Sequence, residues 1–352
     1  MRGLVLDGVG DIAYRTDLPD PTIEAPTDAV VAVHRAGLCG SDLHPYEGRE
    51  SVRFGVVTGH EIVGEVVATG GAVTAVAVGE RVLAAFTTSC GRCAPCRRGL
   101  TARCVRGELF GFGPADRPHA PALHGGQAEL VRVPLADTTL VAVPPSLDDT
   151  AAVLLTDNLP TAWCAVERAD PRPDAPVVVV GLGAVGLCAA AVAIRSDASA
   201  VLAVDPVPAR RAAAARLGVH CARPEAAVEV LSALGSDEGA AAVVEAAGGH
   251  QAQALASELV RPGGTLSVIA VQTGSAFGFS PVDAYGRNLT VRFGRAPVRS
   301  ALDRMLPDAV ELARTLADVV ITHPHVDLAD GPATYERFAR HAGGTIKAVF
   351  AP

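Results

Sequence analysis

The sequence predicts an α/β protein built from two parts, a β-rich part and a doubly wound parallel sheet. Two observations predict this fold class. Short apolar runs separated by turn residues fill the chain up to about residue 145, and strand and helix patterns alternate from Pro176 onward. The length of 352 residues is sufficient for two domains with separate cores.

The first part is expected to consist mainly of strands. Its apolar runs of strand length are DAVVAVHRAG at 28–37, EIVGEVVATG at 61–70 and GERVLAAF at 79–86. Pro144 and Pro145 then mark a change to the helical pattern SLDDTAAVLL. Ser146 is expected to cap this helix, with Asp148 and Asp149 in its first turn, where negative charge is favourable. We therefore place a domain boundary after residue 145.

The second part alternates strands with helices. The predicted strands are 177–180, 198–204, 240–248 and 264–271, and the predicted helices are 184–194, 208–218 and 250–260. This order implies a parallel sheet that is covered on both faces. The alternation ends after about Tyr285, and 343–350 is expected to form a strand that returns to the first part. The predicted domains are therefore residues 1–145 with 287–352, and residues 146–286.

A cluster of four cysteines predicts a structural zinc lobe at about residues 86–112. Cys90, Cys93, Cys96 and Cys104 follow the spacing C-x2-C-x2-C-x7-C, and four thiolates fill every position of a tetrahedral zinc site. Disulfides are one alternative, but nothing marks the chain as secreted, and a chain of this length does not need them. An iron–sulfur centre is the other, but the related bacterial pattern ends in x3-C-P.

The charge of the chain disfavours two classes of partner. A formal net charge of −8 at pH 7 argues against nucleic acids and anionic membranes, because both bind concentrated Lys and Arg. Residues 177–194 carry no charge and could just cross a bilayer, but their glycines fit a buried strand, a tight turn and a buried helix better. The N-terminal segment lacks the apolar core of a secretory signal, so a cytoplasmic protein without a membrane span is expected.

A glycine-rich turn predicts a dinucleotide site. The motif follows the four-valine strand, opens a helix and reads Gly181-Leu182-Gly183-Ala184-Val185-Gly186. Glycines in this pattern permit a tight turn, let a pyrophosphate approach the backbone, and let the helix pack closely on the strand. The helix N-terminus attracts the phosphates. Asp205 ends the next strand and is expected to bind the adenosine ribose and repel a 2′-phosphate, which predicts NAD over NADP. Arg210 and Arg211 are counter-evidence, because an arginine can hold that phosphate.

Four residues from separate segments predict a second kind of metal site. Cys39 lies in AGLCGSDLHPYEG, His60 and Glu61 lie in TGHEIVGEVVATG, and Asp157 lies in LLTDNLPTAW. A thiolate, an imidazole and carboxylates match an open, catalytic zinc site with room for a substrate oxygen. Taken singly, Cys39 could be a small buried apolar residue, His60 a satisfied core histidine and Asp157 a helix cap.

These motifs together resemble the zinc-dependent alcohol dehydrogenases of the medium-chain dehydrogenase/reductase family, over essentially the whole chain. The resemblance rests on Cys39-Gly40-Ser41-Asp42 with His44, Gly59-His60-Glu61 with Gly64 and Gly70, the four-cysteine lobe, Asp157 with Thr161, and the 181–186 turn with Asp205. It implies a GroES-like catalytic domain formed by both ends of the chain, with a Rossmann NAD-binding domain between them.

The resemblance also implies a role for each matching residue. Cys39, His60 and Asp157 would bind the catalytic zinc, and Glu61 would be a nearby carboxylate that can join them. The other implied roles are a proton acceptor for the alcohol (Ser41), an orienting partner of His60 (Asp42), a proton relay to solvent (His44), a nicotinamide contact (Thr161), a pocket wall (Phe86) and a basic residue near Asp42 and the cofactor phosphates (Lys347).

The implied function is hydride transfer between NAD(H) and a primary or secondary alcohol, or in reverse an aldehyde or ketone. Zinc would act as a Lewis acid that lowers the pKa of a bound oxygen, and two zinc ions per subunit are expected, one catalytic and one structural. Polyol, sugar, amino-alcohol and formaldehyde-type dehydrogenases of the same family stay open. The acidic balance disfavours a zinc-ribbon interaction module, and the complete ligand set disfavours a binding-only protein. A small-molecule substrate and a homo-oligomer, a tetramer rather than a dimer, are expected.

Overall fold

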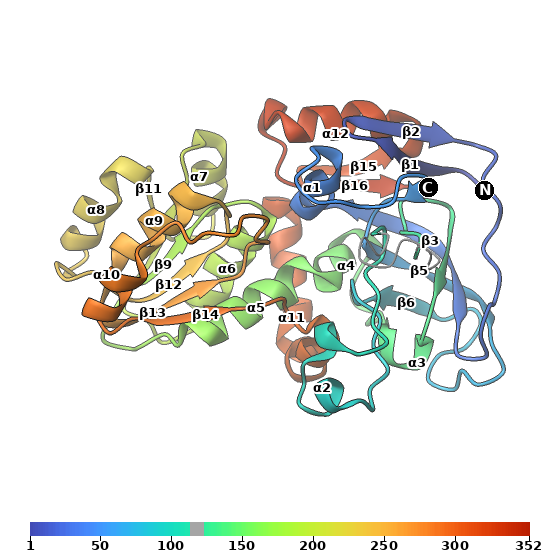
Figure 1. The fold of residues 1–352 in the computed structure, drawn as a ribbon, viewed down its shortest axis with the longest axis horizontal. Helices are drawn as coiled ribbons and strands as arrows, with labels where there is room; N and C mark the ends of the chain where they lie inside the picture. Colours follow the sequence, from blue (N-terminus) through green and yellow to red (C-terminus); the bar gives the residue numbers. More distant parts are fainter. Residues whose placement is uncertain (113–122) are drawn as a thin grey trace. The chain divides into compact units, whose positions relative to one another are not determined.

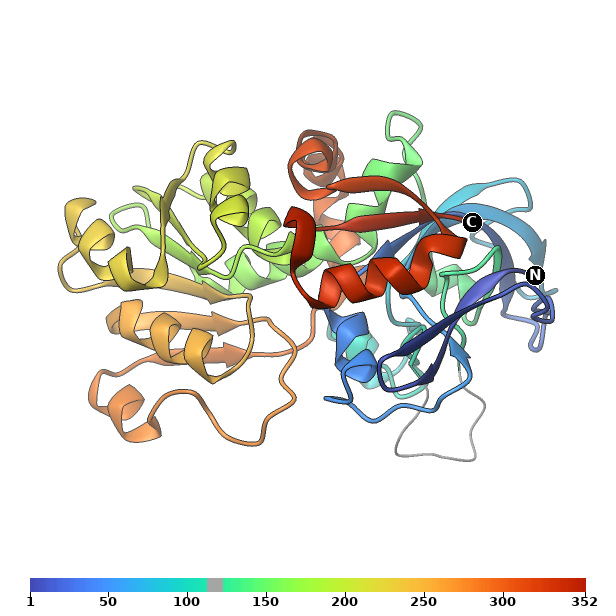
Figure 2. The ribbon, with the colours of Figure 1, turned by 90° about the horizontal axis from the view of Figure 1, so that it is seen from above.

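The computed structural model describes residues 1–112 and 123–352, and it divides into two compact units (Figures 1 and 2). Unit 1 comprises Met1–Pro160 and Pro297–Pro352, and unit 2 comprises Thr161–Ala296. The boundaries between the units therefore lie at 160/161 and 296/297, whereas the sequence predicts them at 145/146 and 286/287. The N-terminal and C-terminal segments share unit 1, as the blue and red ribbons of Figure 1 show.

Unit 1 combines two sheets with several short helices and one long helix. Its strands are β1 (Gly3–Gly8), β2 (Asp11–Arg15), β3 (Ala29–Leu38), β4 (Val56–Val57), β5 (Glu61–Thr69), β6 (Arg81–Ala84), β7 (Leu130–Val133), β8 (Leu140–Ala142), β15 (His323–Asp327) and β16 (Ala348–Ala351). Its helices are α1 (Leu43–Tyr46), α2 (Ala94–Arg97), α3 (Ala136–Thr139), α4 (Asp149–Thr156), α11 (Val298–Val320) and α12 (Gly331–Ala339). Single 3-10 turns occur at η1 (Gly40–Asp42), η2 (Thr101–Arg103), η4 (Leu328–Asp330) and η5 (Ala342–Gly344).

The larger sheet of unit 1 joins both ends of the chain. Its strand order is β15-β16-β3-β5-β6-β8, with β7 also paired to β3, and a smaller sheet has the order β2-β1-β4. The C-terminal strand β16 pairs antiparallel with β3, so the last residues lie beside the segment that leads to Cys39. Helix α12 contacts β2 (Figure 2), and apolar side chains from Leu4 to Phe350 form one core.

Unit 2 is a parallel sheet with helices. Its strands are β9 (Val177–Val180), β10 (Val201–Val204), β11 (His220–Ala222), β12 (Ala240–Glu245), β13 (Val260–Val268) and β14 (Thr290–Phe293), in the order β11-β10-β9-β12-β13-β14. Its helices are α6 (Ala184–Ile194), α7 (Pro208–Ala215), α8 (Ala227–Ala233), α9 (His250–Leu259) and α10 (Pro281–Gly286), with the 3-10 turn η3 (Pro224–Ala226). Helix α5 (Asn158–Ala169) spans the boundary between the units. All six strands run parallel, and the order reverses between β9 and β12.

Three local differences from the sequence analysis have physical causes. Asp148, not Ser146, caps α4, because its carboxylate accepts a hydrogen bond from the Ala151 amide at 2.9 Å. Helix α4 belongs to unit 1, because it packs on β3, β5, β6 and α11. The sheet of unit 2 continues to residue 293 through β14, an edge strand that lies beyond the predicted end of the strand and helix alternation.

Among the described residues, no helix has both the length and the apolar character that a membrane crossing needs.

Candidate active site

Three segments of unit 1 bring the predicted ligands of the catalytic zinc together. Cys39 follows the last residue of β3, and His60 directly precedes β5. These strands pair antiparallel with Gly37 opposite Glu61, so Cys39 and His60 lie side by side. Asp157 caps the C-terminal end of α4, which packs on both strands. The position of each ligand therefore follows from the register of one strand pair and the packing of one helix.

The side chains of Cys39, His60, Glu61 and Asp157 converge on one point. One ligand atom from each of the four residues lies within 4.8 Å of the others. The Asp157 Oδ2 atom is 3.5 Å from the Cys39 Sγ atom and 3.5 Å from the His60 Nε2 atom. A thiol, an imidazole and carboxylates at this spacing can surround a single metal ion.

Asp42 fixes the orientation of the His60 ring. Its Oδ1 atom lies 2.9 Å from His60 Nδ1, and its Oδ2 atom accepts a hydrogen bond from the Cys39 amide at 2.9 Å. His60 Nε2 therefore faces Asp157, with the Ser41 hydroxyl 3.2 Å away. A carboxylate on the second ring nitrogen is the usual partner of a histidine that binds a metal.

The charge of this cluster fits a divalent cation. Burial, followed by the Asp157 and Glu61 carboxylates, raises the pKa of the Cys39 thiol. Burial opposes the charged form of His60, but Asp42 and Asp157 outweigh it and raise the pKa of His60 well above its ordinary value. Cys39 and His60 therefore hold their protons when no metal is bound. A bound cation would displace these protons. The donor set of one sulfur, one nitrogen and one carboxylate fits zinc.

Glu61 is held by two further residues of unit 1. The Asn158 side-chain amide donates to its Oε1 atom at 2.9 Å, and the ammonium of Lys347 donates to its Oε2 atom. Lys347 is the only lysine of the sequence, is 1% exposed, and also donates to the Leu38 carbonyl at 3.3 Å. A Cβ atom on Gly37 would lie 1.7 Å from Glu61 Oε2, so only glycine leaves room for this side chain.

Neither of these two contacts of Glu61 was predicted from the sequence. Asn158 has no motif of its own, although it follows Asp157 directly. Lys347 was expected near Asp42 and the cofactor phosphates, whereas in the structure it pairs with Glu61, and Asp42 bonds to His60 and Cys39. Its contact with a cofactor stays a prediction.

Two aromatic rings lie near His60, and a buried histidine, His44, belongs to α1. The His60 ring lies 6.1 Å from the Phe86 ring and 6.0 Å from the Phe112 ring, measured between centroids. Phe86 was predicted as a pocket wall, and Phe112 was not identified from the sequence. His44 is buried, and burial together with Arg49 lowers its pKa to about 4. His44 is therefore neutral at neutral pH.

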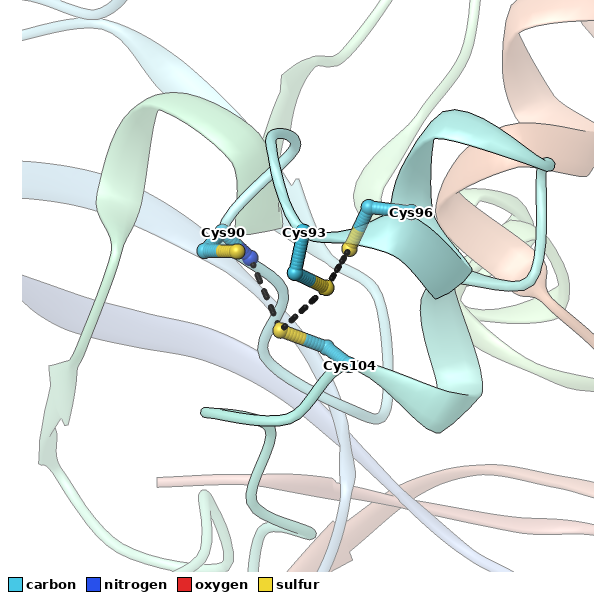
Figure 3. A group of neighbouring side chains, drawn as sticks. All are labelled: Cys90, Cys93, Cys96 and Cys104. Atoms are coloured by element: carbon cyan, nitrogen blue, oxygen red, sulfur yellow. Dashed lines mark hydrogen bonds between the residues drawn. The ribbon is translucent and has the colours of Figure 1, made fainter.

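The four-cysteine cluster forms a separate group in unit 1 (Figure 3). The Cys93 Sγ atom is 3.4 Å from that of Cys96 and 3.9 Å from that of Cys104. Four thiolates around one zinc ion lie about 3.8 Å apart, because each Zn–S bond is about 2.3 Å long. Backbone amides of Cys96 and Val105 lower the pKa of Cys93 to about 6, whereas burial raises that of Cys96 to about 12. None of the eight cysteines is in a disulfide, and this cluster fits a closed structural zinc site.

The glycine-rich turn of unit 2 has the geometry of a phosphate cradle. A Cβ atom on Gly181, which has φ +92°, would lie 2.5 Å from the Ala247 Cβ atom, and one on Gly186 would lie 1.7 Å from the Gly181 carbonyl oxygen. A Cβ atom on Gly183 would meet no atom of the described residues within 4 Å. The first and third glycines are therefore required by packing, and the second leaves the backbone open for a ligand. Ala184 and Val185 begin α6, so their amides lie at the helix N-terminus.

Asp205 lies at the end of β10 and is 2% exposed. Its Oδ2 atom accepts from the Leu182 amide at 2.8 Å, and its Oδ1 atom accepts from the Val207 amide at 2.7 Å. The guanidinium of Arg210 lies 3.7 Å from Oδ2, whereas that of Arg211 donates to the carbonyl oxygens of Asp205 and Pro206. Asp205 thus joins the glycine-rich turn to the start of α7. Thr161, the predicted nicotinamide contact, is buried on α5.

Comparison with known proteins gives matches over both parts of the chain. Residues 25–145 match the alcohol dehydrogenase GroES-like domain, and residues 184–321 match the zinc-binding dehydrogenase family. The chain is 38% identical to a Mycobacterium tuberculosis protein named "Probable zinc-binding alcohol dehydrogenase", over 95% of this chain and 85% of that protein.

Two solved structures have the same fold. The alcohol dehydrogenase TADH from Thermus sp. ATN1 is 35% identical, with a TM-score of 0.89 over 100% of this chain and 99% of that chain. A zinc-binding dehydrogenase from Sinorhizobium meliloti 1021 bound to NADP is 27% identical, with a TM-score of 0.82 over 100% and 99% of the two chains. These matches confirm the predicted α/β fold class with its GroES-like and nucleotide-binding parts.

Proposed function

The chain belongs to the zinc-dependent alcohol dehydrogenases of the medium-chain dehydrogenase/reductase family, and on this premise we propose that it is an NAD-dependent enzyme for primary or secondary alcohols. In reverse it would reduce the corresponding aldehydes or ketones. The observation that carries the proposal is the convergence of Cys39, His60 and Asp157 beside Ser41, all in unit 1.

Each residue of the cluster has a task in this chemistry. Cys39, His60 and Asp157 would hold the catalytic zinc, which when bound supplies Lewis acidity that favours loss of a proton from a substrate alcohol. Asp42 keeps the Nδ1 atom of His60 engaged, so Nε2 is the atom directed at the site. The Ser41 hydroxyl lies 3.2 Å from this atom and is placed to accept the alcohol proton. His44, neutral at neutral pH, has a free site for a proton on its way to solvent.

The hydrogen bonds of Glu61 are compatible with a zinc site in which one coordination position stays open for substrate. Both of its oxygens accept a hydrogen bond from a protein donor, Asn158 on one side and Lys347 on the other. With Glu61 held by these donors, Cys39, His60 and Asp157 are the proposed ligands, and three protein ligands are typical of catalytic zinc sites, in which the fourth position receives water or substrate.

The cofactor proposal is NAD rather than NADP. It is supported by the Asp205 carboxylate, which would repel a 2′-phosphate, and by the position of Arg210, whose charge is directed toward that same carboxylate. Because the Sinorhizobium relative binds NADP, both dinucleotides belong in the test. A kcat/KM that favours NAD supports the proposal, and one that favours NADP refutes it.

A homo-oligomer, a tetramer rather than a dimer, is also proposed. The exposed edge strand β14 supports an oligomer, because its Phe293 side chain is 42% exposed and an unpaired strand edge can pair with a second chain. A cytoplasmic location, where thiols stay reduced, is proposed as well, and the eight cysteines without disulfides are compatible with it.

Steady-state kinetics of the zinc-loaded protein test the enzyme assignment. The panel contains primary and secondary alcohols, polyols, amino alcohols and formaldehyde, each with NAD and NADP. We expect His60→Ala to abolish turnover, whereas the exposed His220→Ala control keeps the parent rate. If the parent, loaded at both metal sites, reduces neither dinucleotide with any of these compounds, the proposed function is wrong.

A further inference from the structure

A buried glutamate in unit 2 has no role in the chemistry described above. Glu245 is the last residue of β12 and is 0% exposed. Its Oε1 atom accepts hydrogen bonds from the amides of Ala247 at 2.8 Å and Gly248 at 2.6 Å. Its Oε2 atom is buried and has no hydrogen-bond partner among the residues that the structure describes. Burial raises the pKa of this carboxyl, although the two amides oppose the rise. Such a group is costly to bury, so its place in the fold needs an explanation.

The turn that Glu245 holds packs directly on the glycine-rich turn. A Cβ atom on Gly181 would lie 2.7 Å from the Ala247 nitrogen as well as 2.5 Å from its Cβ atom, so these two backbones touch. The Ala246 amide donates to the Val180 carbonyl at 2.8 Å, which fixes the start of the turn. Gly248 has φ +81°, a left-handed conformation that favours glycine, and this shape presents its amide to Glu245.

The position in the sheet is the one at which ligands bind to folds of this kind. Glu245 is paired in register with Val180, the residue before Gly181. These two residues end β12 and β9, the neighbouring strands between which the strand order reverses. In open parallel sheets, ligands bind outside the carboxyl ends of the strands at this reversal.

We propose that Glu245 is a positioning residue for the dinucleotide. Its carboxyl accepts the amides of Ala247 and Gly248 and so holds the 246–249 turn against Gly181 before the cofactor arrives. A turn that is already ordered removes part of the entropic cost of binding, and affinity rises accordingly. This inference rests on the proposed dinucleotide-dependent function and adds a residue to it that the glycine-rich motif does not contain.

Calorimetric titration of NAD into the zinc-loaded full-length protein tests the inference. Glu245→Ala removes the acceptor of both amides, and we expect the Kd for NAD to rise about tenfold. The KM for NAD should rise with it, while kcat at saturating NAD stays within about twofold, because the metal cluster lies in unit 1. Glu245→Gln retains a carbonyl oxygen for both amides, and its Kd should stay within about twofold of the parent.

Two further variants separate positioning from a loss of folded protein. Ser267→Ala removes another buried, unpartnered polar atom from the neighbouring strand β13 and should leave the Kd unchanged. Gly248→Ala keeps Glu245 but strains the left-handed residue of the turn, and it should raise the Kd as Glu245→Ala does. This variant provides the measurement if Glu245→Ala does not fold.

Each result of these NAD titrations either supports or overturns the positioning role of Glu245. The inference is overturned if the Glu245→Ala and Gly248→Ala variants bind NAD as the parent does, or if Glu245→Gln loses as much affinity as Glu245→Ala. It is also overturned if Ser267→Ala weakens binding equally, because the effect would then report general destabilisation. A parent protein that binds neither NAD nor NADP refutes the proposed cofactor itself, a different failure that the parent titration alone reveals.

Discussion

Replacing Lys347 with methionine tests whether the buried ion pair with Glu61 stabilises unit 1. Lys347 is 1% exposed and Glu61 is 0% exposed, so neither charge is hydrated. Methionine retains most of the apolar stem but leaves the Glu61 carboxylate with Asn158 as its remaining hydrogen-bond donor from a side chain. Removing one partner of a buried pair costs about 3–5 kcal/mol. For a unit of this size, Tm falls by about 2–4 °C per kcal/mol, so we expect a decrease of about 6–20 °C.

Differential scanning calorimetry of four proteins measures this effect: the parent, Lys347→Met, Glu61→Gln and the double variant. Both candidate metal sites lie in unit 1. The unfolding transition of unit 1 is therefore identified as the one whose Tm changes when zinc is removed. The double variant contains no uncompensated charge, and we expect it to recover more than half of the Tm lost in Lys347→Met. The reasoning is refuted if Lys347→Met melts within about 2 °C of the parent, or if the double variant melts no higher than Lys347→Met.

Three other predictions concern unit 1. Gly37→Ala would place a Cβ atom 1.7 Å from Glu61 Oε2, so zinc content and Tm should both fall, and a variant equal to the parent in both contradicts the role of this glycine. Cys93→Ser should lower Tm and remove one zinc ion per chain, and an unchanged zinc content would show that the lobe does not hold metal. His44 has a pKa of about 4 in the folded protein and about 6.5 when unfolded, so its contribution to stability is complete above pH 6.5 and is lost as the pH falls toward 4. His44→Gln should flatten the fall in urea midpoint over this range, and an equally steep fall rejects the assignment.

Features with a local cause could be predicted from the sequence. The predicted strand 177–180 and helix 184–194 match β9 and α6 residue for residue, because buried valines and a glycine-rich turn determine them over a few positions. The donors Cys39, His60 and Asp157 could likewise be chosen from short motifs. Their convergence depends on the β3–β5 register, which no single motif contains.

Boundaries and edges could not be predicted from the same signals. Three residues near the start of α4 have side chains that can cap a helix, and Asp148 takes this role because its carboxylate reaches the Ala151 amide. Strand β14 has only four residues, TVRF, so its alternation of polar and apolar residues is at the lower limit of length that predicts a strand. The predicted second boundary, 286/287, therefore lies before β14, whereas the observed one follows it.

The contact between Lys347 and Glu61 cannot be predicted from residues that lie near Glu61 in the sequence. Lys347 lies 286 positions away in the chain and reaches Glu61 because β16 pairs with β3. Glu245 shows the same limit in unit 2, because its partners are backbone amides, which carry no sequence signal.

Zinc stoichiometry is the most direct test of the central claim that Cys39, His60 and Asp157 hold a catalytic metal. Mass spectrometry of acid-digested parent and Cys39→Ser protein, combined with the alcohol assay, provides the measurement. We predict two zinc ions per chain in the parent, and one zinc ion with no turnover in Cys39→Ser, because the four-cysteine cluster is untouched. A Cys39→Ser protein that keeps both zinc ions and full turnover would contradict the account.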